Sequence, residues 1–423
     1  MTYGRPLMLT LSSLLGINAL VSAISFVTTL SIAVQLGSSK FGAFSYALVL
    51  GGYVTTIASY GTEQTLVRDL AQSADDFNDN LTASFVVRGT MLLLAICLLV
   101  AGNLFVDAEG RLAIAGLVIV VFEGLKSLYI PQVYDVWGRT KRHAFFFMVE
   151  RSVYFALIWA GLTLWRHEFS LAVIAVAMVI STCAGFTMQY SWAIPRIRLQ
   201  ISRRVMSIAR SMWVGNFWIW VALLSTLSFG ALSKLVLQHT SGSSELGEYS
   251  VAWQVVTLGS LVTGQVARIG YPKLAECVGA GIRNERTRAF VAKYFLFSLG
   301  AGIVVGLPAI LFPSWLLLPL GGQYHAAAES LRILGVYVIL LGAGQVAIQF
   351  LLSSRRGNLY AGTTILTGAT SPFLYVLLVP RMAAEGAALA VVLGHGLAIL
   401  IYCAIMLWDL FGSERRVVLQ QSG

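Results

Sequence analysis

Residues 38–47 read SSKFGAFSYA, and residues 243–252 read SSELGEYSVA. Five of the ten positions are identical, and the two segments lie 205 residues apart. The shared residues include Gly42 and Gly247, which we expect to open a helix after a short turn, because glycine allows tight reversal and close helix packing. The pattern predicts two copies of one structural unit.

Long apolar runs fill both copies. The separation of 205 residues also aligns FVVR at 85–88 with FVAK at 290–293, which extends the repeat beyond the first match. A transmembrane helix needs about 20 apolar residues. Six candidate spans fall in each copy, twelve in all, at approximately 11–35, 41–60, 83–106, 112–136, 144–165, 170–194, 213–236, 249–270, 291–312, 331–352, 359–379 and 387–408.

The two copies are predicted to form two lobes. The second copy begins on the same side of the membrane as the first, so the copies are parallel repeats, an arrangement in which transporters enclose a central site and alternate access to it. We expect an N-terminal lobe at 1–200 and a C-terminal lobe at 201–423, joined by the basic segment 195–212. This segment is expected either to lie as a helix against anionic lipid or to be a solvated connection.

The composition excludes most other classes. Hydrophobic residues make up 57% of the chain and charged residues 11%, whereas soluble chains are about 45–50% apolar and about 25% charged. The apolar runs are continuous, which excludes the alternating pattern of a transmembrane β-barrel. The fold class is therefore an all-α integral membrane protein. No group of cysteines and histidines has metal-ligand spacing, so no metal site is expected.

The basic residues indicate the orientation of the chain in the membrane. Four lie in one set of connections, namely Lys40, Arg111, Arg166 and Arg381. Nineteen lie in the opposite set: Arg5, Arg68, Arg139, Lys141, Arg142, Arg196, Arg198, Arg203, Arg204, Arg210, Lys273, Arg283, Arg286, Arg288, Lys293, Arg355, Arg356, Arg415 and Arg416. The positive-inside rule then predicts that both termini are cytoplasmic. Charges in every second loop mark orientation, so the net charge of +10 gives no reason to expect nucleic-acid binding.

Four charged residues lie deep in the predicted spans. Glu123 and Lys126 share one helical face, and Glu150 and Arg151 follow in the next span. A Lys126–Glu150 contact is sterically reasonable and leaves Glu123 and Arg151 to other partners. Two hypotheses remain open: a structural ion cluster, or a lumen in which Lys126 and Arg151 bind a pyrophosphate or an acidic sugar, with the carboxylates as charge partners.

Other polar residues and prolines give weaker signals. Arg88 and Arg268 lie near span ends, where they either reach the cytoplasmic interface by snorkelling or line the entrance of the lumen. His395 lies in mid-span, where it either carries a coupling proton or is a buried neutral side chain. Pro131 and Pro372 each free a backbone carbonyl, so each is either a hinge or a static kink.

One stretch resembles a known family. Residues 36–72, LGSSKFGAFSYALVLGGYVTTIASYGTEQTLVRDLAQ, are similar to the opening of polysaccharide biosynthesis transporters, the Wzx-type flippases. The resembling features are Leu36-Gly37, Phe41-Gly42, Tyr53, Gly61 and Arg68-Asp69-Leu70-Ala71. The wider superfamily of multidrug, oligosaccharidyl-lipid and polysaccharide exporters has two six-helix lobes.

The resemblance implies a function and its partners. The expected activity is movement of an undecaprenyl-pyrophosphate-linked oligosaccharide from the cytoplasmic to the periplasmic leaflet of a bacterial inner membrane, for O-antigen, lipopolysaccharide or exopolysaccharide synthesis. Expected partners are the lipid-linked glycan, anionic lipids and polysaccharide polymerase or assembly proteins. No cofactor is expected, although proton or sodium coupling is open.

Several alternatives remain beside this interpretation. They are a multidrug or cation antiporter and a lipid II flippase of the same superfamily, and, less favoured, a polytopic glycosyltransferase or a polymerase. A cation exporter needs acids without compensating bases in its lumen, whereas Lys126 and Arg151 lie beside the acids here. Enzymes of these types usually carry a sizeable outer loop, and the predicted outer loops are short. A transporter without enzymatic activity is therefore favoured.

Overall fold

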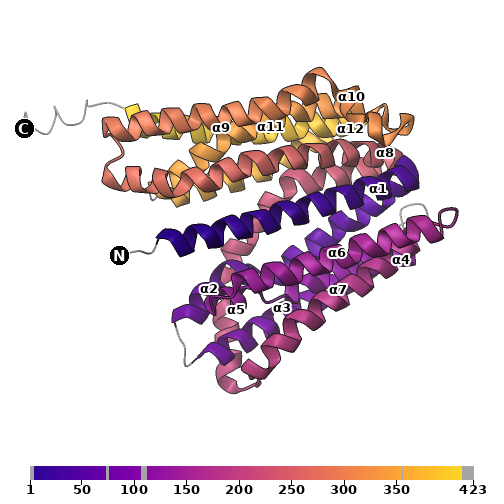
Figure 1. Ribbon diagram of the computed structural model, residues 1–423, viewed down its shortest axis with the longest axis horizontal. Coiled ribbons are helices and arrows are strands. Elements are labelled where there is room, and N and C mark those ends of the chain that lie inside the picture. Colours follow the sequence, from indigo (N-terminus) through magenta and orange to yellow (C-terminus); the bar gives the residue numbers. More distant parts are fainter. Residues whose placement is uncertain (1–3, 73–75, 106–111, 355, 412–423) are drawn as a thin grey trace, which may run out of the picture. The chain divides into compact units, whose positions relative to one another are not determined.

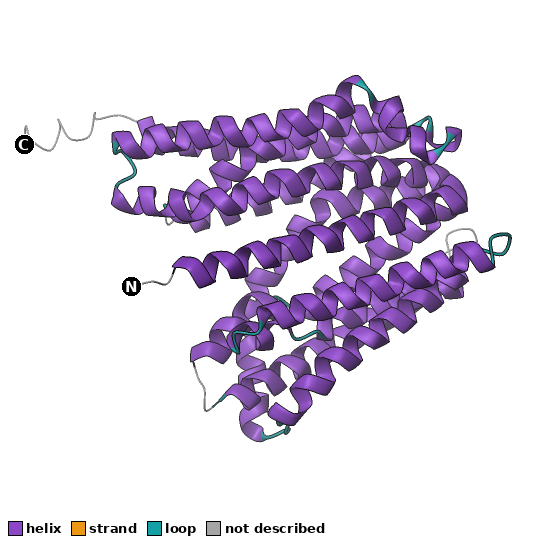
Figure 2. Ribbon diagram, viewed as in Figure 1, coloured by secondary structure: helices purple, strands orange, loops and turns teal. Residues whose placement is uncertain are grey.

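A computed structural model describes residues 4–72, 76–105, 112–354 and 356–411 of the chain. Helices and the turns between them make up this part, which contains no β-strand (Figure 2). The basic residues Arg111, Arg355, Arg415 and Arg416, used above for the orientation, lie outside it. The all-α class predicted from the composition is confirmed for the residues described.

The chain divides into two compact units, Met1–Leu227 and Ser228–Gly423. The division falls inside a long helix, α8 (Arg203–Ala280), rather than at residue 200. The other helices that begin in the first unit are α1 (Gly4–Ser59), α2 (Thr62–Gln72), α3 (Phe77–Phe105), α4 (Ile114–Leu125), η1 (Lys126–Leu128), α5 (Pro131–Val136), α6 (Thr140–Leu164), α7 (Leu171–Ala193) and η2 (Ile194–Arg196). Those of the second unit are α9 (Glu285–Leu311), α10 (Pro313–Leu317), η3 (Leu318–Leu320), η4 (Gly322–Tyr324), α11 (Ala327–Ser353) and α12 (Gly357–Phe411) (Figure 1).

The basic linker predicted at 195–212 is not a separate surface helix. Residues 197–202 are non-helical, and α8 begins at Arg203 and continues into the next predicted span. Val205 and Ala209 on its first turns are buried in the core of the first unit. Arg204 pairs with Asp76 and Asp79, so ion pairs as well as apolar contacts hold this segment to the start of α3.

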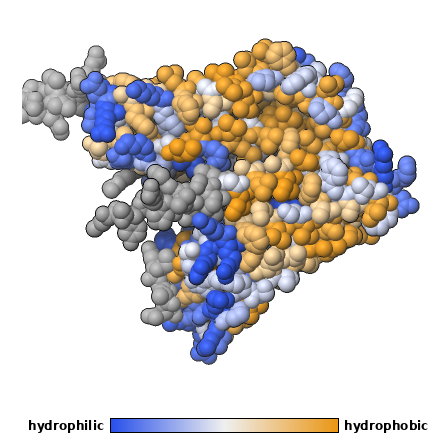
Figure 3. All heavy atoms as spheres, in the orientation of Figure 1, coloured by the Kyte–Doolittle hydropathy of each residue, from blue (hydrophilic) through white to orange (hydrophobic). Residues whose placement is uncertain are grey.

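Eight described helices are long and apolar enough to cross a membrane, or nine if the two parts of α8 form one span. Three of the long helices, α1, α8 and α12, each cover two predicted spans. The backbone of each is interrupted between its two spans, at Gly37 in α1, Gly242 in α8 and Ala383 in α12. The prediction of twelve spans is compatible with these breaks but stays a prediction. On the face shown in Figure 3, hydrophobic residues cover the middle of the helices and hydrophilic ones gather towards their ends.

The breaks in α1 and α8 occur at equivalent positions of the sequence repeat. Gly37 has φ 74° and ψ 170°, and Gly242, 205 residues later, has φ 84° and ψ 179°. Such positive φ values are accessible to glycine at little cost. Gly42 and Gly247 lie inside the helices that follow, five residues beyond each break. The turn glycines are therefore Gly37 and Gly242. Each lies one residue before a matched segment, 38–47 or 243–252, and is not part of it.

Close packing in the second unit depends on small residues. α11 packs against α9 and α12, and Gly302 and Gly306 of α9 face Gly335 and Gly342 of α11. A Cβ added at Gly306 would lie 2.5 Å from the carbonyl oxygen of Gly335, and one at Gly335 would lie 2.8 Å from that of Gly306. The two backbones therefore touch without side chains between them, as in small-residue packing of membrane helices.

Candidate functional site

The four deep charges predicted from the sequence line one cavity inside the first unit. The cavity has a volume of about 240 Å³. Its walls come from both parts of α1 and from α4, η1, α6 and α7. The lining residues are Thr29, Phe44, Leu48, Glu123, Lys126, Glu150, Arg151, Tyr154, Met178 and Ser181.

Close helix packing positions the acidic side of this cavity. α1 approaches α4 so closely that a Cβ on Gly51 would lie 2.6 Å from the Cβ of Glu123. The hydroxyl of Thr55 lies 2.8 Å from the carbonyl oxygen of Gly51 and 2.9 Å from that of Glu123, and its one proton is shared between them. These contacts fix the backbone of Glu123, and its carboxylate remains available for a partner in the cavity.

The ion pairing inside the cavity differs from the expected one. Lys126 Nζ contacts Glu123 Oε2 at 2.6 Å, and no Lys126–Glu150 ion pair is present among the described residues. The two paired residues are three apart, a spacing that places both side chains on one helical face. The ion-pair partner of Lys126 is therefore Glu123, three residues earlier in the chain, and not Glu150.

Glu150 is held by a tyrosine instead. Its side chain is 2% exposed, and its Oε2 accepts a hydrogen bond of 3.0 Å from the hydroxyl of Tyr129. Gly185 of α7 makes room for this pair, since a Cβ there would lie 2.7 Å from Glu150 Oε2 and 2.8 Å from Tyr129 Oη. Sequence reasoning missed both Tyr129 and Gly185, because neither carries a charge.

Arg151 is the second cation of this cavity, and unlike Lys126 it forms no ion pair with a described residue. Its guanidinium lies over the ring of Phe147, 5.0 Å from the ring centroid. Its Nε is buried without a hydrogen-bond partner, and no described residue forms an ion pair with it. A planar, forked donor of this kind suits an anionic oxygen group such as a phosphate.

Arg88 does not reach the membrane interface and does not line the cavity. Its side chain is 0% exposed. Its Nε donates to the Thr62 hydroxyl at 2.6 Å, and its Nη1 donates to the carbonyls of Ser127 and Tyr129 at 3.2 and 3.0 Å. The snorkelling interpretation is therefore wrong, and we do not include Arg88 among the residues that contact substrate.

Pro131 explains why the arginine lies there. The helix stops at η1 and resumes at Pro131, which has no N–H and so cannot donate to the carbonyl of Ser127, four residues earlier. Arg88 supplies that missing donor. Two residues of α7 also form hydrogen bonds to the backbone at this break. The Tyr190 hydroxyl donates to the carbonyl of Leu128, and the side-chain oxygen of Gln189 accepts from the N–H of Ile130.

The remaining predicted residues lie in the second unit. Arg268 is exposed on α8. The ring of His395 packs edge-on against Tyr337 at 4.8 Å between centroids. The helix continues through Pro372, and the non-helical residue in α12 is Ala383. The hinge and coupling roles of these residues stay predictions.

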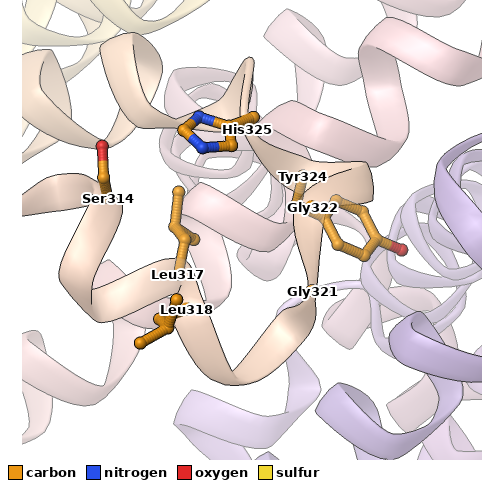
Figure 4. A pocket seen from close by; sticks show the side chains of 7 residues that line it. All are labelled: Ser314, Leu317, Leu318, Gly321, Gly322, Tyr324 and His325. Atoms are coloured by element: carbon orange, nitrogen blue, oxygen red, sulfur yellow. The ribbon is translucent and has the colours of Figure 1, made fainter.

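A second, smaller pocket lies in the second unit, in the segment from α10 to η4. Its volume is about 140 Å³, and its lining residues are Ser314, Leu317, Leu318, Gly321, Gly322, Tyr324 and His325. Figure 4 shows the His325 imidazole above Leu317, with the Tyr324 side chain pointing away. One histidine and one hydroxyl offer little for recognising a charged group, so this pocket does not compete with the cavity of the first unit.

Comparison with known proteins identifies relatives of this chain. The family model described as polysaccharide biosynthesis protein matches residues 10–277. A protein of Haloferax volcanii, described as the probable flippase AglR, is 21% identical over 275 residues, which cover 62% of this chain and 53% of that protein. The chain thus matches about half the length of this curated relative.

Solved structures share the fold. A structure of the lipid II flippase MurJ in an inward closed conformation matches with a TM-score of 0.68 and 10% identity, over 92% of this chain and 86% of that one. An inward-facing multidrug resistance MATE family transporter of the MOP superfamily matches with a TM-score of 0.66 and 14% identity, over 90% and 93%. At these identities the likeness shows the fold alone.

Proposed function

The chain belongs to the polysaccharide biosynthesis protein family, and from this membership we propose that the protein is a flippase for a lipid-linked oligosaccharide. The proposed substrate is a glycan on undecaprenyl pyrophosphate, moved from the cytoplasmic to the periplasmic leaflet of a bacterial inner membrane. The product would serve the synthesis of a surface polysaccharide such as O-antigen. The proposed mechanism is alternating access, with the lipid tail remaining in the bilayer while the head group moves.

Arg151 is the observation that supports this proposal most directly. It is a cation in a cavity of a membrane protein and forms no ion pair with a described residue, and a charge inside a membrane is costly unless it has a function or a partner. A pyrophosphate supplies the missing anionic partner. Lys126 adds a second cation once its bond to Glu123 loosens.

The pairing of the charges in the cavity disfavours a drug or cation antiporter. Of its two carboxylates, Glu123 is paired with Lys126, and Glu150 accepts a hydrogen bond from Tyr129. An organic cation would therefore compete with Lys126 for Glu123 and would lie close to the guanidinium of Arg151. An anionic head group can bind Arg151, which forms no ion pair with a described residue, and for this reason we prefer the lipid-linked glycan.

Complementation of a flippase-deficient bacterium tests the proposal. We expect the wild-type chain to restore surface glycan, and Lys126→Ala and Arg151→Ala to reduce it at least about tenfold, since a hydrogen bond to a charged group contributes about 1.5–3 kcal/mol. Membrane levels of all variants are matched by immunoblotting.

Arg332→Ala is the matched control, because Arg332 is also an arginine in a helix but is 49% exposed, pairs with Glu329 and lies outside the cavity. It should restore surface glycan like wild type. If both cavity variants insert normally and restore as much glycan as wild type, the cavity is not the substrate site. If the cavity variants restore normal surface glycan and Arg332→Ala does not, the substrate site lies outside the cavity.

A further inference from the structure

An apolar groove runs along the second unit between the last part of α8 and the first part of α9. Its volume is about 640 Å³, within the range of about 300–1,000 Å³ that is usual for sites of small organic ligands. The lining residues are Val262, Gln265, Val266, Ile269, Gly270, Lys273, Phe290, Lys293, Tyr294 and Phe297. All belong to the second unit, and none of them lines the cavity around Arg151.

Each wall of the groove is one face of a helix. On α8 the lining positions from 262 to 273 recur every three or four residues, and on α9 those from 290 to 297 do the same. Gly270 lets the two helices meet below the groove, because a Cβ there would lie 2.3 Å from the ring of Tyr294. The floor of the groove is therefore closed by packed side chains.

The groove is polar at one end and apolar along its length. Lys273 and Lys293 both lie about two turns from the α8–α9 connection at 281–284. From Lys273 to Val262 the groove follows α8 for roughly 16 Å, about half of the roughly 30 Å hydrocarbon core of a bilayer. It thus has the depth of a single lipid leaflet, with its charged end near the helix ends.

Both lysines are available to bind an anion. Lys273 pairs with Glu276 at 2.7 Å, but the two side chains are 44% and 66% exposed, and exposed pairs of this kind contribute little. Lys293 is exposed and forms no ion pair with a described residue. The apolar wall is open as well, since Val262, Ile269 and Phe297 are 47%, 71% and 68% exposed. Such an exposed apolar wall is a surface on which an acyl chain can pack.

We propose that this groove binds one anionic phospholipid of the surrounding bilayer. The head-group phosphate lies between the ammonium groups of Lys273 and Lys293, and an acyl chain lies along Val262, Ile269 and Phe297. Complementary charge at one end and a leaflet-deep apolar wall select a lipid with a negative head group over a zwitterionic one. The proposal does not depend on the transport function, because any bilayer with anionic lipid supplies the ligand.

Native mass spectrometry of the purified full-length protein tests the proposal, with phosphatidylglycerol as probe and phosphatidylcholine as zwitterionic comparison. We expect the wild type to retain phosphatidylglycerol in preference to phosphatidylcholine. The double variant Lys273→Gln and Lys293→Gln should lose about tenfold in phosphatidylglycerol affinity, given about 1 kcal/mol for each basic residue near a membrane surface. The single variant Val262→Trp, which keeps both lysines but fills the deep end, should also weaken retention.

The double variant Arg283→Gln and Arg286→Gln is the matched control. It removes two positive charges from the same end of the unit without touching the groove, and it should bind phosphatidylglycerol like wild type. Monodisperse elution and an unchanged melting temperature show that each variant is folded. Equal affinity in the lysine variant and the control, equal retention of the two lipids, or retention of undecaprenyl pyrophosphate in place of phosphatidylglycerol would each overturn the proposal.

Discussion

Arg88 shows how a buried charge can be structural. Its guanidinium occupies the interruption between η1 and α5, where it replaces the donor that Pro131 lacks. The sequence placed this arginine within a turn or two of a span end, which made snorkelling a reasonable expectation. The position of Arg88 along its own helix could not reveal that the neighbouring segment has carbonyls without a helical donor, at Ser127 and Tyr129, close to the guanidinium.

Replacing Arg88 should therefore lower stability. We expect Arg88→Ala to reduce the free energy of unfolding by at least about 2 kcal/mol, because the carbonyls of Ser127 and Tyr129 and the hydroxyl of Thr62 lose a donor, at about 1–3 kcal/mol for each buried group left unsatisfied. Thermal unfolding in detergent measures the loss. Arg268→Ala, at an exposed arginine, serves as the control, and equal melting temperatures for the two variants would contradict the structural role of Arg88.

The deep charges could be predicted as a group, but their pairing could not. Continuous apolar runs made Glu123, Lys126, Glu150 and Arg151 conspicuous, and the short connection between their helices brought them together. The partner of Glu150 is a neutral tyrosine, reached only because Gly185 has no side chain. Charge spacing contains no information about such an uncharged partner, so it could not show that Lys126 pairs with Glu123 while Glu150 bonds to Tyr129.

At the scale of elements, glycine decides how closely helices pack. On α9, Gly306 touches the backbone of Gly335, whereas Gly300 has open space around its Cβ position. The sequence shows both glycines in the same apolar run and cannot tell them apart, because the difference arises from the neighbouring helix α11.

This contrast gives a paired prediction. Gly306→Ala should destabilise the protein by about 1–3 kcal/mol, the usual cost of overpacking, because its Cβ would lie 2.5 Å from the carbonyl oxygen of Gly335. Gly300→Ala should be neutral or slightly stabilising, since alanine favours a helix by up to about 1 kcal/mol over glycine. Unfolding in mixed detergent gives both values, and an equal effect of the two substitutions would refute close α9–α11 contact at Gly306.

At the scale of the whole molecule, the internal repeat was the most informative signal. The breaks at Gly37 and Gly242 have the same separation, 205 residues, as the matched segments beside them, and nearly the same φ and ψ. The composition therefore predicted the helical class, and the repeat predicted a turn that occurs twice. The division between the two units, after Leu227, lies inside α8 (Arg203–Ala280), where no loop marks it in the sequence.

The cavity around Arg151 is the proposed binding site for the anionic head group of a transported lipid. Translocation of a pyrophosphate-linked oligosaccharide lipid by the purified protein in vesicles tests it most directly. We expect transport by the wild type, partial transport by Arg151→Lys, which keeps the charge but loses the fork, and at least about tenfold slower transport by Arg151→Ala. Transport by Arg151→Ala at the wild-type rate, or wild-type transport of a matching glycolipid without phosphate at the same rate, would contradict the claim.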